Sequence, residues 1–185
     1  MPEPRPLLVV VYGPPFSGTG EVARAIARSL PGRSAVLSAD ALLEAIVVNW
    51  DNAADELDMV HEQIRHLTVY YLKHGYHLVV EGPFLFQRQG RLFDYQPHID
   101  QLLALMRNLI SGQAIVRLGL TEELTRKRAR AAGRIDAGEA SVRLAGAYRT
   151  RSGPAVFTFD SGTESPAEIA AAVYEELMKG PDGRV

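Results

Sequence analysis

The chain has 185 residues, of which 46% are hydrophobic, 23% charged and 8% aromatic, as is typical of one soluble globular domain. It contains no cysteine, which excludes disulfides, thiolate metal sites and a cysteine nucleophile. Twenty basic residues oppose twenty-two acidic ones, and the resulting charge of −2 gives no support to a nucleic-acid or membrane partner. Seventeen of the twenty basic residues are Arg and only three are Lys.

No segment predicts secretion or membrane insertion. The longest apolar stretch near the N-terminus, residues 7–12, is far shorter than the ~20 residues needed to span a bilayer. The first six residues lack the basic region and long apolar segment of a secretory signal. We therefore expect a cytoplasmic protein.

Short apolar runs alternate along the chain with amphipathic segments of helical length. Residues 7–12 are continuously apolar and rich in β-branched side chains, which is typical of a strand buried on both faces of a parallel sheet. Further strands are predicted over 34–38, 77–81, 114–120 and 155–159. Helices are predicted over 21–30, 40–50, 53–74, 99–110, 121–132, 139–148 and 165–179, with a loop from 84 to 97. This alternation predicts an α/β fold with a five-stranded, parallel, doubly wound sheet, in a single domain spanning 1–185.

The first strand leads into a glycine-rich loop and then a helix, the arrangement of the phosphate-binding template G-x-x-x-x-G-K-[ST]. Backbone N–H groups of such a loop and the helix N-terminus bind phosphate without help from side chains. Thr19 stands in the position of the lysine and Gly20 in that of the magnesium-binding Ser or Thr, so the Walker A motif is degenerate. The predicted phosphate-binding residues are Gly13, Pro14, Pro15, Phe16, Ser17, Gly18, Thr19 and Gly20. The alternative is a glycine-rich turn that caps a helix and binds no ligand.

With this loop and this order of elements, the chain resembles the P-loop nucleoside and small-molecule kinases. That group includes adenylate, shikimate and gluconate kinases and chloramphenicol phosphotransferase. The resemblance covers nearly the whole chain as an order of elements, although the specific motifs cover much less of it. It implies ATP or another nucleoside triphosphate and Mg²⁺ as cofactors, and a hydroxyl-bearing small molecule as the acceptor.

Two carboxylates follow predicted strands at the sheet edge that carries the phosphate loop. Asp40 follows the second strand, which places it well for a general base that activates the acceptor hydroxyl. Its alternative role is the N-cap of the next helix. Glu81 ends the third strand and resembles the second acidic motif of the kinases, which holds magnesium. Because Gly20 offers no oxygen ligand, Asp40 and Glu81 are the candidates for holding Mg²⁺, and the alternative for Glu81 is to cap backbone N–H groups.

An arginine-rich segment follows the fourth predicted strand, where the kinases have a lid. Arg126 and Arg130 lie four residues apart and share a helical face, while Arg134 follows Gly133. The resemblance implies a lid over about 121–138, in which these three arginines contact nucleotide phosphates and Arg126 and Arg130 act in catalysis. Lys127 and Arg128 are expected to point elsewhere. A solvated helix face is the alternative.

The remaining polar residues give weaker signals. Arg88 and Arg91, in the segment after the third strand, are candidates for binding the acceptor. The five histidines show no metal-binding spacing. Residues 160–163 occupy the position of the adenine pocket in the kinases, and they also form a good turn.

The sequence thus predicts an ATP-dependent phosphotransferase that acts on a hydroxyl of a small molecule. The altered loop keeps two alternatives open: a pseudokinase that binds nucleotides or anions without catalysing transfer, and a scaffold that retains only the fold.

Overall fold

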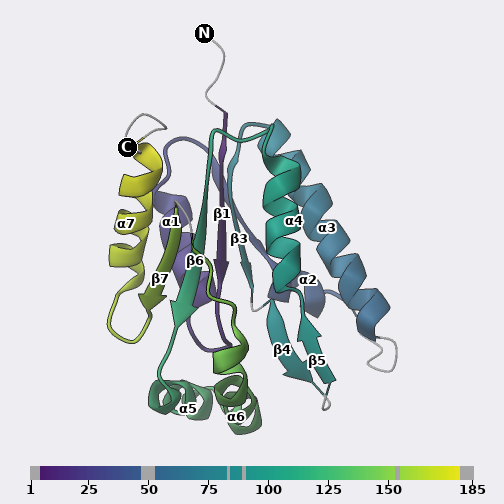
Figure 1. The fold of residues 1–185 in the computed structure, drawn as a ribbon, viewed down its shortest axis with the longest axis vertical. Helices are drawn as coiled ribbons and strands as arrows, with labels where there is room; N and C mark the ends of the chain where they lie inside the picture. The colour runs from purple at the N-terminus through teal and green to yellow at the C-terminus, as the bar shows by residue number, and fades with distance from the viewer. Residues whose placement is uncertain (1–4, 47–52, 83, 89–90, 153–154, 180–185) are drawn as a thin grey trace.

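The fold is described from a computed structural model, over residues 5–46, 53–82, 84–88, 91–152 and 155–179 (Figure 1). Seven strands occupy β1 Leu7–Tyr12, β2 Ser34–Ser38, β3 His77–Gly82, β4 Leu85–Arg88, β5 Arg91–Asp94, β6 Gly112–Gly119 and β7 Val156–Asp160. The helices are α1 Thr19–Ser29, α2 Ala39–Glu44, α3 Ala53–Lys73, α4 Gln96–Met106, α5 Glu122–Ala131, α6 Ile135–Leu144 and α7 Pro166–Met178, with a short 3₁₀ turn at Ala145–Ala147. None of these helices is long and apolar enough to cross a membrane.

Five strands form one parallel sheet in the order β2-β3-β1-β6-β7. The sequence prediction of a five-stranded, parallel, doubly wound sheet is therefore confirmed. The order places β1 at the centre, and its six residues are all buried because helices cover both faces of the sheet. Parallel strands bring their carboxyl ends to one edge, so the segments that follow β1, β2, β3, β6 and β7 meet there.

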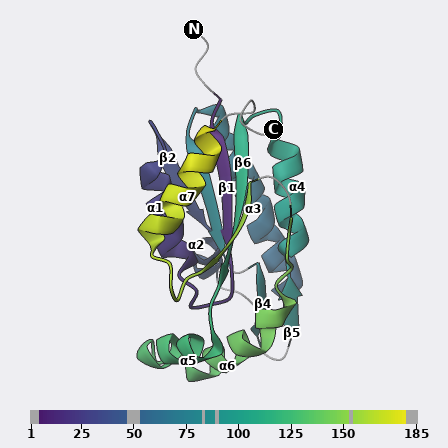
Figure 2. The same ribbon diagram turned by 60° about the vertical axis from the view of Figure 1, so that its left-hand side comes forward.

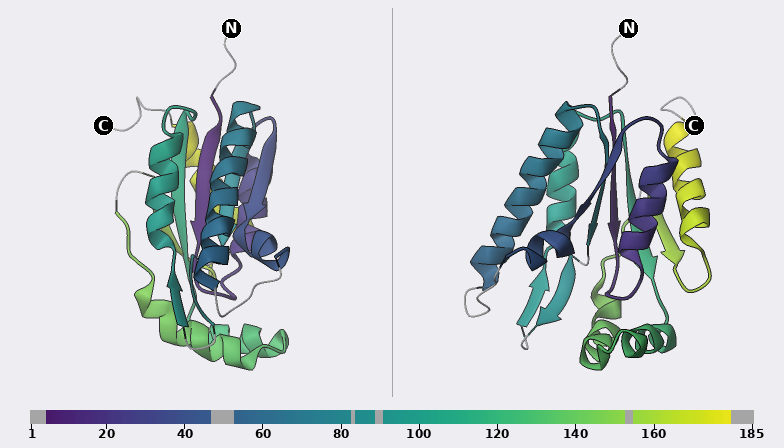
Figure 3. Two further views of the ribbon diagram at one scale, coloured as in Figure 1. Left: turned by 90° about the vertical axis from the view of Figure 1, so that its right-hand side faces the viewer. Right: turned by 180° about the vertical axis from the view of Figure 1, so that it is seen from behind.

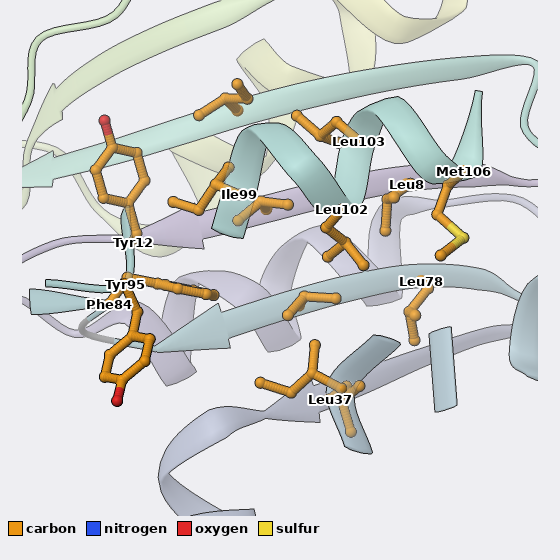
Figure 4. Packing of buried hydrophobic residues seen from close by; sticks show 14 of the residues in the cluster. Leu8, Tyr12, Leu37, Leu78, Phe84, Tyr95, Ile99, Leu102, Leu103 and Met106 are labelled. Carbon is orange, nitrogen blue, oxygen red and sulfur yellow. The ribbon is translucent and has the colours of Figure 1, made fainter. Parts of the chain in front are cut away.

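Helices α3 and α4 cover one face of the sheet, and α1 and α7 cover the other (Figures 1 and 3). The side chains of β1 alternate between two buried clusters, so Leu8, Val10 and Tyr12 face α3 and α4. Figure 4 shows Ile99, Leu102 and Met106 of α4 packed on Leu8 and Leu78 of the sheet. Val9 and Val11 pack instead against α1 and α7.

Two features at the carboxyl edge differ from the sequence prediction. The segment 84–97, expected to be a loop, contains an antiparallel hairpin in which β4 pairs with β5. The helix expected at 139–148 begins earlier, at Ile135, and ends at Leu144. Together, α5 and α6 cross beneath the sheet edge (Figures 1 and 2).

Candidate functional site

The segment between β1 and α1 forms a tight loop whose backbone requires glycine at two positions. Gly18, the N-cap of α1, has a left-handed backbone with φ of 84°. A side chain on Gly13 would lie 2.7 Å from the carbonyl oxygen of Leu118 and 2.8 Å from Oγ of Ser17. Phe16 also has a positive φ of 71°, a conformation that is costly for a bulky residue. Contacts from elsewhere in the fold must therefore stabilise the loop.

The loop presents backbone N–H groups that have no partner in the part of the chain described. Ser17 donates its N–H to the carbonyl of Pro14 at 3.1 Å, while Pro14 and Pro15 have no N–H to donate. The N–H groups of Phe16, Gly18, Thr19 and Gly20 make no hydrogen bond with the described residues. Such N–H groups at the start of a helix are able to bind phosphate oxygens.

A cavity of about 530 Å³ separates the loop from the lid. Its walls come from the loop, from α2, from β4 and from α6. The lining residues are Gly13, Pro14, Pro15, Phe16, Thr19, Asp40, Leu43, Glu44, Ile46, Phe86, Gln87, Arg134, Ala137, Ala140, Ser141 and Leu144. The predicted loop and Asp40 therefore share one cavity, which has the size of a small-molecule site.

Asp40 lies in the first turn of α2 and lines this cavity. The N-cap of α2 is Ser38, whose side chain accepts the N–H of Ala41 at 3.3 Å, so the alternative N-cap role for Asp40 is wrong. Desolvation, followed by the carboxylates of Glu81 and Glu44, raises the pKa of Asp40 to about 6. Because Asp40 is exposed to solvent, screening by water weakens these charge interactions.

Glu81 is almost completely buried, with 5% exposure, at the carboxyl end of β3. Its Oε1 lies 3.8 Å from the point where a side chain on Gly20 would begin. Among the described residues, the side chain of Glu81 makes no hydrogen bond or ion pair, whereas its backbone belongs to the sheet. An ionised carboxylate buried without a partner is costly, so a cation beside Gly20 would be favoured there.

The donor set at this position fits magnesium better than a metal held by protein alone. Within the described ranges no group of three or more His, Cys, Asp or Glu side chains could hold a metal ion. Asp40 and Glu81 supply two carboxylates, and the charge of Glu81 adds to desolvation, the larger cause, in raising the pKa of Asp40. Mg²⁺ commonly takes one or two protein carboxylates and completes its shell with phosphate oxygens and water.

The three predicted lid arginines occupy different environments. Arg134 lines the cavity, and its guanidinium lies 5.9 Å from the centre of the Phe16 ring. Arg126 instead forms ion pairs with Glu139 at 2.9 Å and Glu122 at 3.2 Å. Arg130 is exposed and is not among the cavity-lining residues. Of the three predicted arginines, Arg134 alone is thus placed beside the loop in this conformation.

The expectation that Arg128 points away from the site is wrong. Its Nη1 donates to the carbonyl of Phe16 at 2.9 Å, and its Nη2 donates to the carbonyl of Ser161 at 2.8 Å. A second lid side chain, Ser141 of α6, donates its hydroxyl to the carbonyl of Pro15 at 3.1 Å. Both helices of the lid therefore contact the strained part of the loop.

The predicted acceptor-binding arginines lie at the far end of the β4–β5 hairpin. Arg91 is exposed and does not line the cavity, and the side chain of Arg88 lies outside the described residues. The hairpin contributes Phe86 and Gln87 to the cavity instead. The sequence did not single out Phe86, Gln87 or Glu44 as site residues. For Glu44, the four-residue spacing from Asp40 was a usable signal of a shared helical face.

Several solved structures with the same fold are kinases of small molecules. Adenylylsulfate (APS) kinase of Mycobacterium tuberculosis, solved with AMPPNP and APS, is 20% identical, with a TM-score of 0.65 over 95% of this chain and 99% of that one. A gluconokinase from Sinorhizobium meliloti is 20% identical, with a TM-score of 0.60 over 96% and 94%. A sugar kinase from Janibacter is 14% identical, with a TM-score of 0.60 over 98% and 99%.

No protein-family model matches the sequence, and no curated protein matches it significantly. The similarity is therefore one of structure: the chain has the fold of the P-loop small-molecule kinases.

Proposed function

We propose that this protein is an ATP-dependent phosphotransferase that transfers a phosphoryl group to a hydroxyl of a small molecule. The observation that carries the proposal is the cavity in which the phosphate loop faces Asp40 at the carboxyl edge of a kinase-like sheet. One cavity then holds both donor and acceptor, and catalysis of phosphoryl transfer depends largely on positioning and charge stabilisation.

Each part of the cavity has a task in this proposal. The free N–H groups of the loop would bind the nucleotide phosphates, and Arg134 would add positive charge beside them. Asp40, with a pKa of about 6, is ionised at neutral pH and would accept the proton of the acceptor hydroxyl. Asp40 and Glu81 would hold Mg²⁺, which neutralises charge on the phosphates when it is bound.

Arg126 and Arg130 remain proposed catalytic residues only if the lid changes conformation. Arg126 would have to leave the carboxylates of Glu122 and Glu139 to reach a transferred phosphate. These ion pairs are partly exposed, and such pairs contribute only ~0–1 kcal/mol. A triphosphate could therefore compete for Arg126.

The second candidate function is a nucleotide- or anion-binding module that does not catalyse transfer. Thr19 favours it, because this residue lines the cavity where the template has a lysine. A charge-assisted hydrogen bond of ~1.5–3 kcal/mol is missing there, and its loss in a transition state costs at least as much.

Calorimetry with ATP, in the presence and absence of Mg²⁺, tests nucleotide binding. Release of ADP across a panel of small alcohols and sugars then tests transfer. Magnesium-dependent ATP binding with acceptor-dependent ADP release supports the phosphotransferase. ATP binding with no ADP release from any acceptor supports the binding module, and no nucleotide binding at millimolar concentration contradicts both.

A further inference from the structure

The acceptor end of the cavity differs in charge from its nucleotide end. Arg134, the cationic side chain among the described residues of the lining, lies over Phe16 at the phosphate loop. The α2 wall carries Asp40 and Glu44, and no described basic side chain lines that wall. A molecule that enters beside α2 therefore meets negative charge.

Glu44 has no task in phosphoryl transfer and no protein partner in the described chain. It makes neither a hydrogen bond nor an ion pair there. It lies four residues after Asp40, so both carboxylates share one face of α2, an arrangement that destabilises a helix by ~0.2–0.5 kcal/mol. Its charge also lies at the helix C-terminus, where the helix dipole disfavours an acid.

A third carboxylate strengthens the negative potential. Glu81 is 5% exposed, and its side chain has no hydrogen-bond or ion-pair partner among the described residues. Desolvation is the main cause of the raised pKa of Asp40, and the charges of Glu81 and Glu44 add to it, whereas the charge of Arg134 lowers it. One Mg²⁺ held by Asp40 and Glu81 would leave the solvent-exposed carboxylate of Glu44 available to pair with a cation of the acceptor.

The rest of the acceptor end is apolar or neutral. Leu43 and Ile46 lie on the α2 side, Phe86 and Gln87 on β4, and Leu144 on α6. Such walls suit a carbon skeleton. An anionic acceptor would meet Glu44, while Arg134, the basic side chain among the described lining residues, lies over Phe16 at the loop.

From this lining we infer that the acceptor is a hydroxylated amine, such as an amino alcohol or amino sugar, whose ammonium group pairs with Glu44. The inference rests on the proposed phosphotransferase function, because it assigns the acceptor of that same cavity. Asp40 would face the hydroxyl, and Glu44 lies about 6 Å farther along α2, the rise of four helical residues. The reacting hydroxyl and the ammonium group are thus separated by about one helical turn.

Direct binding measured by calorimetry, with and without AMPPNP and Mg²⁺, tests this inference. Two series matched in skeleton but not in charge are used. The first is glucosamine, glucose and glucuronate, and the second is ethanolamine, ethylene glycol and glycolate. In at least one series the amine should bind at least tenfold more tightly than the neutral compound, and the acid should bind least. Equal affinities, preference for an acid, or no binding of either amine would overturn the inference.

Substitution of Glu44 identifies the source of any preference. Glu44→Gln should reduce amine binding about tenfold, leave neutral compounds unaffected and preserve ATP affinity. Glu175→Gln, at an exposed position of α7 away from the cavity, is the matched control and should leave amine and ATP binding unchanged. An unchanged amine preference in Glu44→Gln overturns the inference. Phosphoryl transfer to neutral or anionic alcohols alone would also overturn the inference, while the proposed function would stand. Amine selectivity without ATP binding would contradict only the proposed function.

Discussion

Arg128 donates a hydrogen bond of 2.9 Å to the carbonyl of Phe16, which joins the lid to the phosphate loop. The same guanidinium donates to the carbonyl of Ser161 in the loop after β7. Segments from three parts of the sequence are thus held together by one side chain. Phe16 is the loop residue with the costly positive φ, so the contact stabilises a conformation that the residue disfavours alone.

Substitution of Arg128 should therefore impair nucleotide binding. Arg128→Ala is expected to weaken ATP binding about tenfold, equivalent to one charge-assisted hydrogen bond, because the loop loses a contact that fixes its shape. Arg128→Lys should restore part of the affinity, since an ammonium can still reach one carbonyl. Calorimetry measures both, and Lys127→Ala, at an exposed position on the same helix, is the control. Equal ATP affinity in Arg128→Ala and the unmodified protein would show that the loop does not need this contact.

Restoring the template residues should strengthen the phosphate site. Thr19 lines the cavity, so a lysine there would reach bound phosphate, and Gly20 has space for a serine because the nearest atom to its added Cβ is 3.4 Å away. Thr19→Lys with Gly20→Ser is expected to tighten ATP binding ~10- to 200-fold, using the energy of one charged hydrogen bond. Thr158→Lys, exposed on edge strand β7, controls for added charge. No gain in the double variant would mean that phosphates bind elsewhere.

Asp40→Asn should lower the rate of phosphoryl transfer and raise the stability of the fold at neutral pH. As the proposed base, Asp40 contributes ~10²- to 10⁴-fold to kcat, so the variant should lose transfer but keep the ATP binding that is measured without Mg²⁺. The raised pKa of Asp40 means that the folded state binds its proton more tightly than the unfolded state. Stability therefore falls as pH rises from about 4 to about 6, and the asparagine removes this loss.

Thermal unfolding provides the measurement. The melting temperature of Asp40→Asn should exceed that of the unmodified protein at pH 7.5 and match it at pH 3.5. A lower melting temperature at both pH values, together with loss of ATP binding, would instead indicate a structural role for Asp40.

His61 should make stability depend on pH in the opposite direction. Its ring stacks on Tyr95 at 4.1 Å and on His98 at 4.6 Å between centroids. Burial, followed by the charge of His98, lowers the pKa of His61 from 6.5 to about 4. The unfolded state binds the proton more tightly, so this stability is complete above pH 6.5 and is lost as pH falls towards 4.

His61→Phe should keep the ring stacking and remove this pH dependence. The free energy of unfolding, measured by urea titration, is compared at pH 7 and pH 4.5 for both proteins. Its fall over this range should be about 2 kcal/mol smaller in His61→Phe than in the unmodified protein. Parallel pH profiles for the two proteins would contradict a buried, neutral His61. His66→Phe, at a partly exposed position on α3, is the control.

Local sequence signals determined the sheet and the phosphate loop. Short apolar runs predicted β1, β2, β3, β6 and β7, and the run of β1 is continuously apolar because a central parallel strand is covered on both faces. Gly13 and Gly18 marked the loop because backbone crowding at one and a left-handed φ at the other exclude most side chains. The chain order of strands also placed Asp40 and Glu81 at the edge that carries the loop.

The lid and the acceptor end depended on contacts between distant segments. Helical spacing placed Arg126 and Arg130 on one face, but packing of α5 against α6, where Ala129 lies close to Gly138, decides which face meets the loop. That packing pairs Arg126 with Glu139 and brings Arg128 to Phe16, separated by 112 residues in the sequence. The β4–β5 hairpin was not predicted because each strand has only four residues, in a segment rich in Gly, Pro, Gln and Arg that is typical of a loop. The sequence by itself thus determined the glycine-rich loop that is proposed to bind phosphate, whereas only tertiary packing decided which arginine touches this loop and that the α2 side of the cavity is acidic.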